Sequence, residues 1–171
     1  MKINYKEIIL LIASLIFVFL MMNYTFENDV IFWYLYAFTL LVGIAVSLIS
    51  SKFNDELPTW NYLIFGIGYG TILYGIIRLG HTILPQLDNN FEKELLQFLN
   101  TFAPQNIWHY LLLVFIIVIG EEMFWRGYVQ QKLKAFTRPI YAVFVTSILF
   151  SLSLAISGFA AGAIAAFVIG I

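Results

Sequence analysis

Long apolar runs, separated by short polar segments, make up most of this 171-residue chain. They constrain the fold strongly, because about 20 apolar residues form a helix that crosses the hydrocarbon core of a bilayer. Only 11% of the residues are charged, whereas about 25% are charged in a soluble domain. We therefore expect an all-α, polytopic transmembrane bundle of about five to six spans, forming a single integral membrane domain over residues 1–171.

The charge balance and the absence of cysteine exclude several classes of function. Nine Lys and Arg face ten Asp and Glu, so the net charge is −1 and no basic surplus is available to bind nucleic acid. The chain has no Cys, which excludes disulfide frameworks, iron–sulfur clusters, thiolate zinc sites and cysteine nucleophiles. The lipid bilayer is the partner that this composition indicates.

The positions of the apolar runs predict where the helices lie. The expected spans are approximately 8–22, 30–49, 60–84, 107–126, 139–157 and 158–171. Residues 89–102 differ, because Phe91, Leu95 and Phe98 recur at helical spacing while acidic side chains occupy the other face. This pattern predicts an amphipathic helix that lies at the membrane surface.

The basic residues predict the orientation. They cluster before the first span, between the second and third, and between the fourth and fifth: Lys2, Lys6, Lys52, Lys132, Lys134 and Arg138. These three clusters fall on one side of the membrane, which the positive-inside rule assigns to the cytoplasm together with the amino terminus. The aromatic residues that open the second span, Phe32, Trp33, Tyr34 and Tyr36, suit a membrane interface. We expect a multi-pass protein of the plasma membrane.

Glu121, Glu122 and Arg126 form the one constellation that apolar packing does not explain. A carboxylate in hydrocarbon costs a few kcal/mol or more, and two adjacent carboxylates compound this cost. Glu122 and Arg126 are four residues apart, so on a helix they share a face and can pair. Glu121 points about 100° away and needs another partner. A carboxylate in such a position is suited to activate water as a general base.

Three other interpretations of this constellation stay open. The charged residues can form a solvated helix end at the lipid–water boundary. Two carboxylates can bind a metal ion, although such ions usually need further ligands. The carboxylates can also serve as the proton or cation site of a small transporter, although no inverted repeat is visible in the sequence.

The string GEEMFWRG, residues 120–127, resembles the first motif of the CAAX prenyl protease and bacteriocin-processing family, also called CPBP or Abi. The matching residues of its EExxxR pattern are Glu121, Glu122 and Arg126, with Phe124 at the aromatic position. The resemblance implies an intramembrane endopeptidase that acts on a membrane-associated peptide or protein near the cytoplasmic face. It also implies that Glu121 is the general base and that Glu122 and Arg126 support it. A metal cofactor is possible by this resemblance, but its ligands are not evident, so the cofactor stays unknown.

The sequence departs from the family pattern after this motif. The second motif, FxxxH, finds its aromatic residue at Phe150, but Leu154 stands where the histidine is expected. The third motif, a histidine on a later helix, does not occur before Ile171. The expectation is a truncated copy or a divergent, catalytically altered member. An inactive member that acts as a membrane scaffold or immunity protein is therefore the alternative function.

Other polar residues in the spans have simpler interpretations. Ser147, Ser151, Ser153 and Ser157 can line a polar cavity, but small residues that permit close helix packing are the favoured interpretation. His81 and His109 lie near the predicted outer side, and His109 precedes Glu121 by about 18 Å of helix. Both histidines are expected to be interfacial residues rather than ligands.

Overall fold

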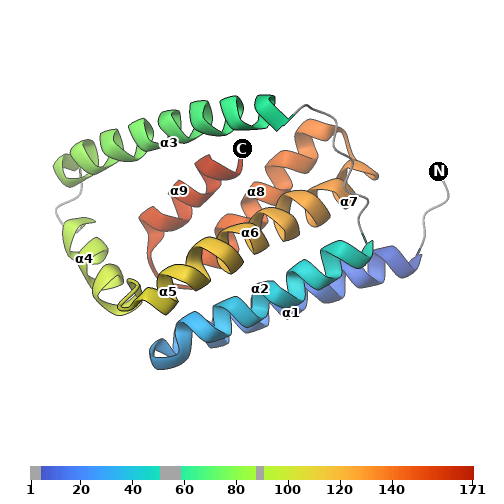
Figure 1. The fold of residues 1–171 in the computed structure, drawn as a ribbon, viewed down its shortest axis with the longest axis horizontal. Coiled ribbons are helices and arrows are strands. Elements are labelled where there is room, and N and C mark those ends of the chain that lie inside the picture. The colour runs from blue at the N-terminus through green and yellow to red at the C-terminus, as the bar shows by residue number, and fades with distance from the viewer. Residues whose placement is uncertain (1–4, 51–58, 88–90) are drawn as a thin grey trace.

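The computed structural model describes residues 5–50, 59–87 and 91–171, and every element in these ranges is a helix (Figure 1). The first part holds α1 (Tyr5–Glu27), the short 3₁₀ helix η1 (Asp29–Ile31), α2 (Phe32–Ser50), α3 (Thr59–Leu87) and α4 (Phe91–Phe102). The last part ends in α8 (Pro139–Ala155) and α9 (Ala160–Gly170). The all-α prediction is therefore confirmed for the described residues.

Between α4 and α8 lies one long helix, Ile107–Lys134, which we call the motif helix. It consists of α5 (Ile107–Leu112), η2 (Leu113–Ile117), α6 (Val118–Glu121), η3 (Glu122–Gln130) and α7 (Gln131–Lys134). The segments η2 and η3 are π-helical. The side chain of Asn106 caps its start by accepting a hydrogen bond from the His109 amide at 3.0 Å.

Three of the described helices are long and apolar enough to cross a membrane: Tyr5–Glu27, Asp29–Ser50 and Ile107–Lys134. A shorter apolar helix, Pro139–Ala155, accompanies them. Predicted spans 60–84 and 158–171 are also helical, within α3 and α9, and α9, with 11 residues, is shorter than a helix that crosses a bilayer. Three helices long and apolar enough to cross a membrane agree with the predicted membrane protein, whereas the total of five to six spans stays a prediction.

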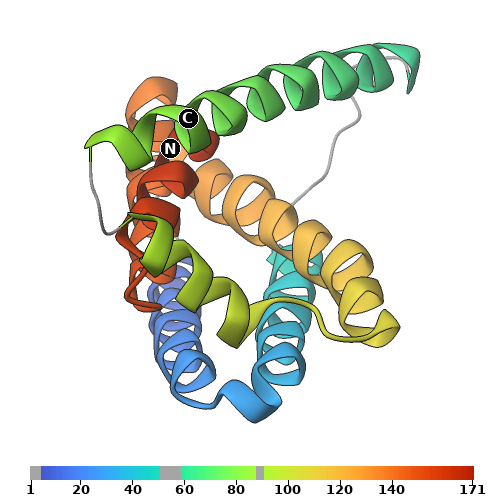
Figure 2. The same cartoon turned by 90° about the vertical axis from the view of Figure 1, so that its left-hand side faces the viewer.

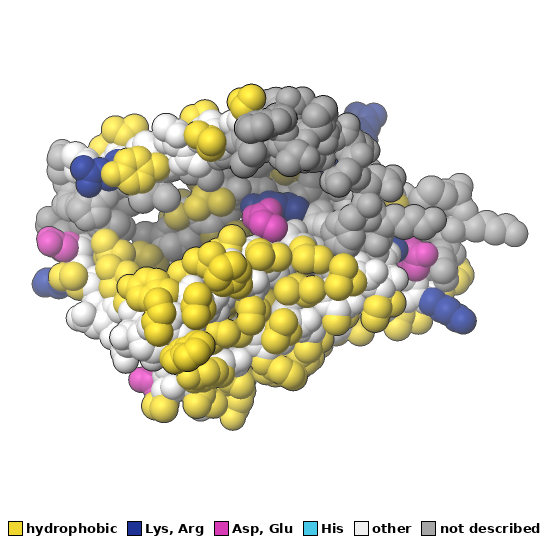
Figure 3. Space-filling view, in the orientation of Figure 1, with side chains coloured by type: hydrophobic (Ala, Val, Ile, Leu, Met, Phe, Trp, Pro, Cys, Tyr) yellow, Lys and Arg dark blue, Asp and Glu magenta, His cyan; other side chains and the backbone are white. Residues whose placement is uncertain are grey.

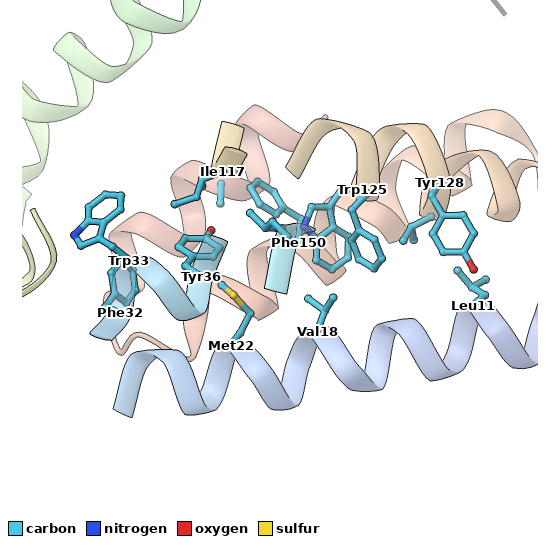
Figure 4. Packing of buried hydrophobic residues seen from close by; sticks show 14 residues of the cluster. Leu11, Val18, Met22, Phe32, Trp33, Tyr36, Ile117, Trp125, Tyr128 and Phe150 are labelled. Atoms are coloured by element: carbon cyan, nitrogen blue, oxygen red, sulfur yellow. The ribbon is translucent and has the colours of Figure 1, made fainter. Parts of the chain in front are cut away.

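The core lies where α1, α2 and the motif helix meet (Figures 1 and 2). Figure 4 shows apolar side chains from these helices pointing toward one another, with Phe150 of α8 among them. The buried members of this cluster are Leu11, Val18, Met22, Phe32, Trp33, Tyr36, Leu40, Ile117, Phe124, Trp125, Tyr128, Val129, Phe150 and Ala166. The motif helix therefore packs mainly against α2 and, next, against α8.

Most of the aromatic residues at the start of α2 are buried inside the protein. Phe32, Trp33 and Tyr36 are buried in the core, and only Tyr34 of these four is exposed, at 57%. These three side chains therefore pack inside the protein, and the membrane depth of this end of α2 stays a prediction. They are buried because α4 and the motif helix cover them: the Phe32 ring lies 4.7 Å from that of Phe102.

Helix α4 confirms the predicted helix at residues 89–102 over Phe91–Phe102. Its apolar face packs on other elements, because the Phe98 ring lies 4.9 Å from that of Phe159 and stacks on it. Figures 1 and 2 show α3 running apart from the bundle that α1, α2 and the motif helix form.

Helices α8 and α9 form a hairpin, and small residues line their contact. Gly158, with φ of +76°, makes the turn between them, a conformation that glycine adopts without strain. A Cβ at Gly170 would lie 2.9 Å from Ser147 Cβ, so the two helices approach closely there. Ser151 donates a hydrogen bond to the Ala163 carbonyl at 2.6 Å.

The remaining serines, two in α8 and Ser157 just beyond its end, bond to backbone carbonyls of the same segment. Ser147 donates to the Val143 carbonyl, Ser153 to the Phe150 carbonyl and Ser157 to the Leu154 carbonyl. Their hydroxyls are thus satisfied locally. These contacts favour the close-packing interpretation over a polar cavity.

Candidate active site

The motif helix changes its winding at the two glutamates. Glu121 is the last residue of α6, and Glu122 is the first residue of the π-helical segment η3. A π-helix is wider than an α-helix, and short π segments occur frequently at functional sites. The change of winding sets the directions in which Glu121, Glu122 and Arg126 point.

Helix α2 and the motif helix approach each other closely next to Glu121, at Gly120. A Cβ at Gly120 would lie 2.8 Å from Leu40 Cβ, closer than real Cβ atoms come. One turn further along, a Cβ at Gly43 would lie 3.2 Å from Phe124 Cδ2. Because residue 120 is glycine, the backbone just before Glu121 can lie against α2.

A polar contact joins the same two helices beyond this point. The Ser47 hydroxyl lies 2.8 Å from the Gly43 carbonyl of its own helix and 3.1 Å from the Met123 carbonyl of η3, and it donates toward both. Ser47 is fully buried. This hydroxyl therefore contacts a backbone carbonyl between Glu122 and Phe124 in the motif.

Glu121 points toward α2 and accepts a hydrogen bond from the hydroxyl of Tyr36 at its Oε1 atom. Tyr36 is buried, and Figure 4 shows its ring inside the core cluster, near Ile117. Glu121 itself is half-buried. Glu121, which does not share a helix face with Arg126, thus has a hydrogen-bond partner on α2.

Glu122 and Arg126 form the ion pair that their spacing predicted, with Arg126 Nη1 3.0 Å from Glu122 Oε1. The side chain of Glu122 is 57% exposed and that of Arg126 is 26% exposed. In Figure 3 an acidic side chain lies beside basic ones in the hollow between α3 and the motif helix. The two glutamates therefore occupy different environments, one facing the core and one facing outward.

Arg126 also connects the motif helix to α8 and α9. Its Nη2 donates a hydrogen bond to the Ile169 carbonyl at 3.1 Å. Its guanidinium carbon lies 5.6 Å from the centroid of the Phe150 ring, within the range of a cation–π contact. One side chain thus contacts Glu122 and both helices of the carboxyl-terminal hairpin.

The remnant of the second motif lies beside this Arg126 contact. Phe150 is buried against Arg126 and Trp125, whose ring centroid lies 5.8 Å from its own. Leu154, one turn further along α8, is half-buried and packs against the hydrophobic core. The position at which the family pattern has a histidine is therefore an apolar packing position in this chain.

The described contacts of His109 do not bring this side chain to Glu121. The His109 ring stacks on that of Trp33, with ring centroids 5.3 Å apart. Its Nδ1 atom accepts a hydrogen bond from the backbone amide of Gln105. These contacts agree with a role in packing at the start of the motif helix. The side chain of His81 lies outside the described residues.

The described residues around Glu121 and Glu122 do not fit a metal site. Among the described residues no group of three or more His, Cys, Asp or Glu is placed to hold an ion. Glu121 bonds to Tyr36 and Glu122 pairs with Arg126, so each carboxylate has a protein partner.

The sequence pattern does not identify three residues of the site. Tyr36 was interpreted as an interfacial aromatic, and Ser47 and Gly120 were given no role. The available signal was the spacing of Tyr36, Leu40, Gly43 and Ser47, which places these residues on one face of a helix. Nothing in that spacing shows that the opposite helix is the one carrying the glutamates.

Comparison with known proteins relates the second part of the chain to a family. Residues 102–171 match the family described as "Type II CAAX prenyl endopeptidase Rce1-like". The match includes the motif helix, α8 and α9, and therefore Glu121, Glu122, Arg126, Phe150 and Leu154. No curated protein and no solved structure matches the chain.

Proposed function

Residues 102–171 form a domain of the Rce1-like family of type II CAAX prenyl endopeptidases, and from this premise we propose that the chain is an intramembrane endopeptidase. It hydrolyses a peptide bond of a membrane-associated peptide or protein near the cytoplasmic face. The amino terminus is cytoplasmic, because the three basic clusters then lie on the cytoplasmic side. Glu121, Glu122 and Arg126 make up the active centre.

In this proposal Glu121 acts as the general base. A water molecule gives a proton to the Glu121 carboxylate while its oxygen attacks the carbonyl carbon of the scissile bond. The proton then passes to the amide nitrogen as the C–N bond breaks, so the products are a free amine and a carboxylic acid. One water is consumed for each bond cleaved, and Glu121 returns to its carboxylate form.

Glu122 and Arg126 support Glu121 rather than replace it. Their ion pair offsets the charge of the exposed carboxylate, and the contacts of Arg126 with Phe150 and Ile169 join η3 to α8 and α9. An Arg–carboxylate pair combines charge with directional hydrogen bonds, so it orients both partners.

The observation that carries the proposal is that the two adjacent glutamates have different partners. Glu122 is neutralised by Arg126, whereas Glu121 faces the core and has a neutral tyrosine as its partner. Its negative charge is thus not cancelled by an adjacent cation in direct contact. A carboxylate used as a base needs this property, because a close ion pair would lower its readiness to accept a proton.

The test is cleavage of a farnesylated, internally quenched CAAX peptide by the purified protein in liposomes. The wild type is expected to release the carboxyl-terminal peptide, identified by mass spectrometry. Glu121→Ala is expected to abolish release while the helical circular dichroism spectrum is retained. Unchanged release by the Glu121→Ala protein would contradict the proposal.

A second candidate function follows from Leu154. Because an apolar residue stands where the family pattern has a histidine, the chain can be an inactive member that acts as a membrane scaffold or immunity protein. Such a protein would cleave no peptide, and it would keep its biological effect when both glutamates are replaced. The peptide-release assay separates this candidate from the endopeptidase.

A further inference from the structure

Tyr36 is the group that contacts the proposed base, and we propose that it is a positioning residue for Glu121. This role rests on the proposed function, because it concerns how the base is held for the attack of water. The contact lies between α2 and the motif helix, which are 85 residues apart in sequence at this point. Neither the family pattern nor the matched residues 102–171 include Tyr36.

The chemistry of the contact leaves the base free to act. The Tyr36 hydroxyl donates to Oε1 of Glu121, so Oε2 is the oxygen left to receive a proton from water. A phenol hydroxyl keeps its own proton in the physiological pH range, because tyrosine ionises at a pKa near 10 in water. One hydrogen bond therefore sets the plane of the carboxylate without neutralising it.

The tyrosine is itself held in place. Its side chain is buried, and its ring lies 5.6 Å from the ring of Phe32 in an edge-to-face arrangement. Four residues later on α2, Leu40 touches the motif helix at Gly120, the residue before Glu121. The close packing of α2 on the motif helix at Leu40 and Gly120 therefore lies within one helical turn of both Tyr36 and Glu121 and holds the donor near the acceptor.

The face of α2 that carries Tyr36 contacts the motif helix along its length. Leu40 lies at Gly120, Gly43 lies at Phe124, and Ser47 donates to the Met123 carbonyl. These contacts fix the two helices against sliding and rotation, since each one needs the same alignment. Positioning of a catalytic group to within about 1 Å can account for about 100-fold in rate.

The test compares Tyr36→Phe with Tyr34→Phe in the farnesylated-peptide assay. Tyr36→Phe removes one hydroxyl from the site, whereas Tyr34 is an exposed tyrosine on the same helix. We expect Tyr36→Phe to lower kcat by about 10- to 100-fold with little change in KM. Tyr34→Phe is expected to leave both values unchanged.

A spectroscopic measurement keeps the test independent of turnover. The infrared carboxylate band that disappears in Glu121→Gln identifies Glu121, and its frequency reports hydrogen bonding. We expect Tyr36→Phe to shift this band and Tyr34→Phe to leave it in place. An unshifted band in Tyr36→Phe would overturn the proposal.

The kinetic outcomes separate this inference from the proposed function. If Glu121→Gln is inactive while Tyr36→Phe matches Tyr34→Phe, the positioning role is overturned and the endopeptidase stands. If the wild type cleaves nothing, or Glu121→Gln retains full activity, both proposals are overturned. A loss in Tyr36→Phe that equals its loss of folded protein shows a structural role and overturns the positioning role.

Discussion

Replacing Gly120 by alanine tests how closely the site depends on the approach of α2 to the motif helix. The added Cβ would lie 2.8 Å from Leu40 Cβ, whereas carbon atoms in contact prefer about 3.5–4.0 Å. Leu40 Cβ is fixed to its backbone, so the helices must separate by about 1 Å to restore contact distance. Such overpacking costs about 1–3 kcal/mol of folding free energy.

This displacement acts directly on the base. Gly120 precedes Glu121, and Leu40 lies one turn from Tyr36, so both ends of the Tyr36–Glu121 hydrogen bond are next to the enforced shift. We expect peptide release by Gly120→Ala to fall by about 100-fold. The thermal unfolding temperature is expected to fall by roughly 3–10 °C.

The assay follows thermal unfolding in detergent by tryptophan fluorescence, because Trp125 and Trp33 are buried in the core and report its loss. Gly70→Ala on α3 is the matched control, since its added Cβ would meet nothing within 4 Å. The unfolding temperature of Gly43→Ala should lie between those of Gly120→Ala and Gly70→Ala, because the Phe124 side chain can move by a few tenths of an ångström to make room for the added Cβ. A Gly120→Ala protein with wild-type unfolding temperature and wild-type cleavage would refute the reasoning.

Three further substitutions test other contacts of the motif helix. Ser47→Ala removes the hydrogen bond to the Met123 carbonyl and should cost about 0.5–1.5 kcal/mol in denaturant unfolding; an unchanged unfolding free energy would contradict the contact. Arg126→Lys keeps the charge but loses the planar fork, so peptide release should slow by about 10-fold, and an unchanged rate would show that charge alone suffices. Lys132→Gln breaks the partly exposed pair with Glu7 and should cost at most about 1 kcal/mol, so a loss above about 3 kcal/mol would refute this assignment.

Local spacing predicted those parts of the structure that depend on neighbours in sequence. The Glu122–Arg126 pair follows from residues four apart on one helix, and the structure contains it. The small side chain of Ser147 favoured close helix packing, and α9 approaches α8 at this residue through Gly170. In each case the interacting groups lie on one helix or on two helices joined by a short turn.

The partner of Glu121 depends on tertiary packing and could not be predicted. Tyr36 lies 85 residues away, and its sequence context of aromatic residues suited an interface equally well. Burial of Phe32, Trp33 and Tyr36 follows from the covering helices and not from α2 itself. The π-helical winding of η3 also has no signal in the apolar pattern, which was interpreted with α-helical spacing.

The central claim is that Glu121, and not its neighbour, activates water. It is tested most directly by the single-turnover rate of peptide cleavage in Glu121→Gln and Glu122→Gln, two isosteric changes at adjacent positions. We predict a loss of about 10²- to 10⁴-fold for Glu121→Gln, the usual contribution of a general base. Because Glu122 is exposed and pairs with Arg126, Glu122→Gln should lose much less. Equal rates for Glu121→Gln and the wild type, or a larger loss in Glu122→Gln, would contradict the account.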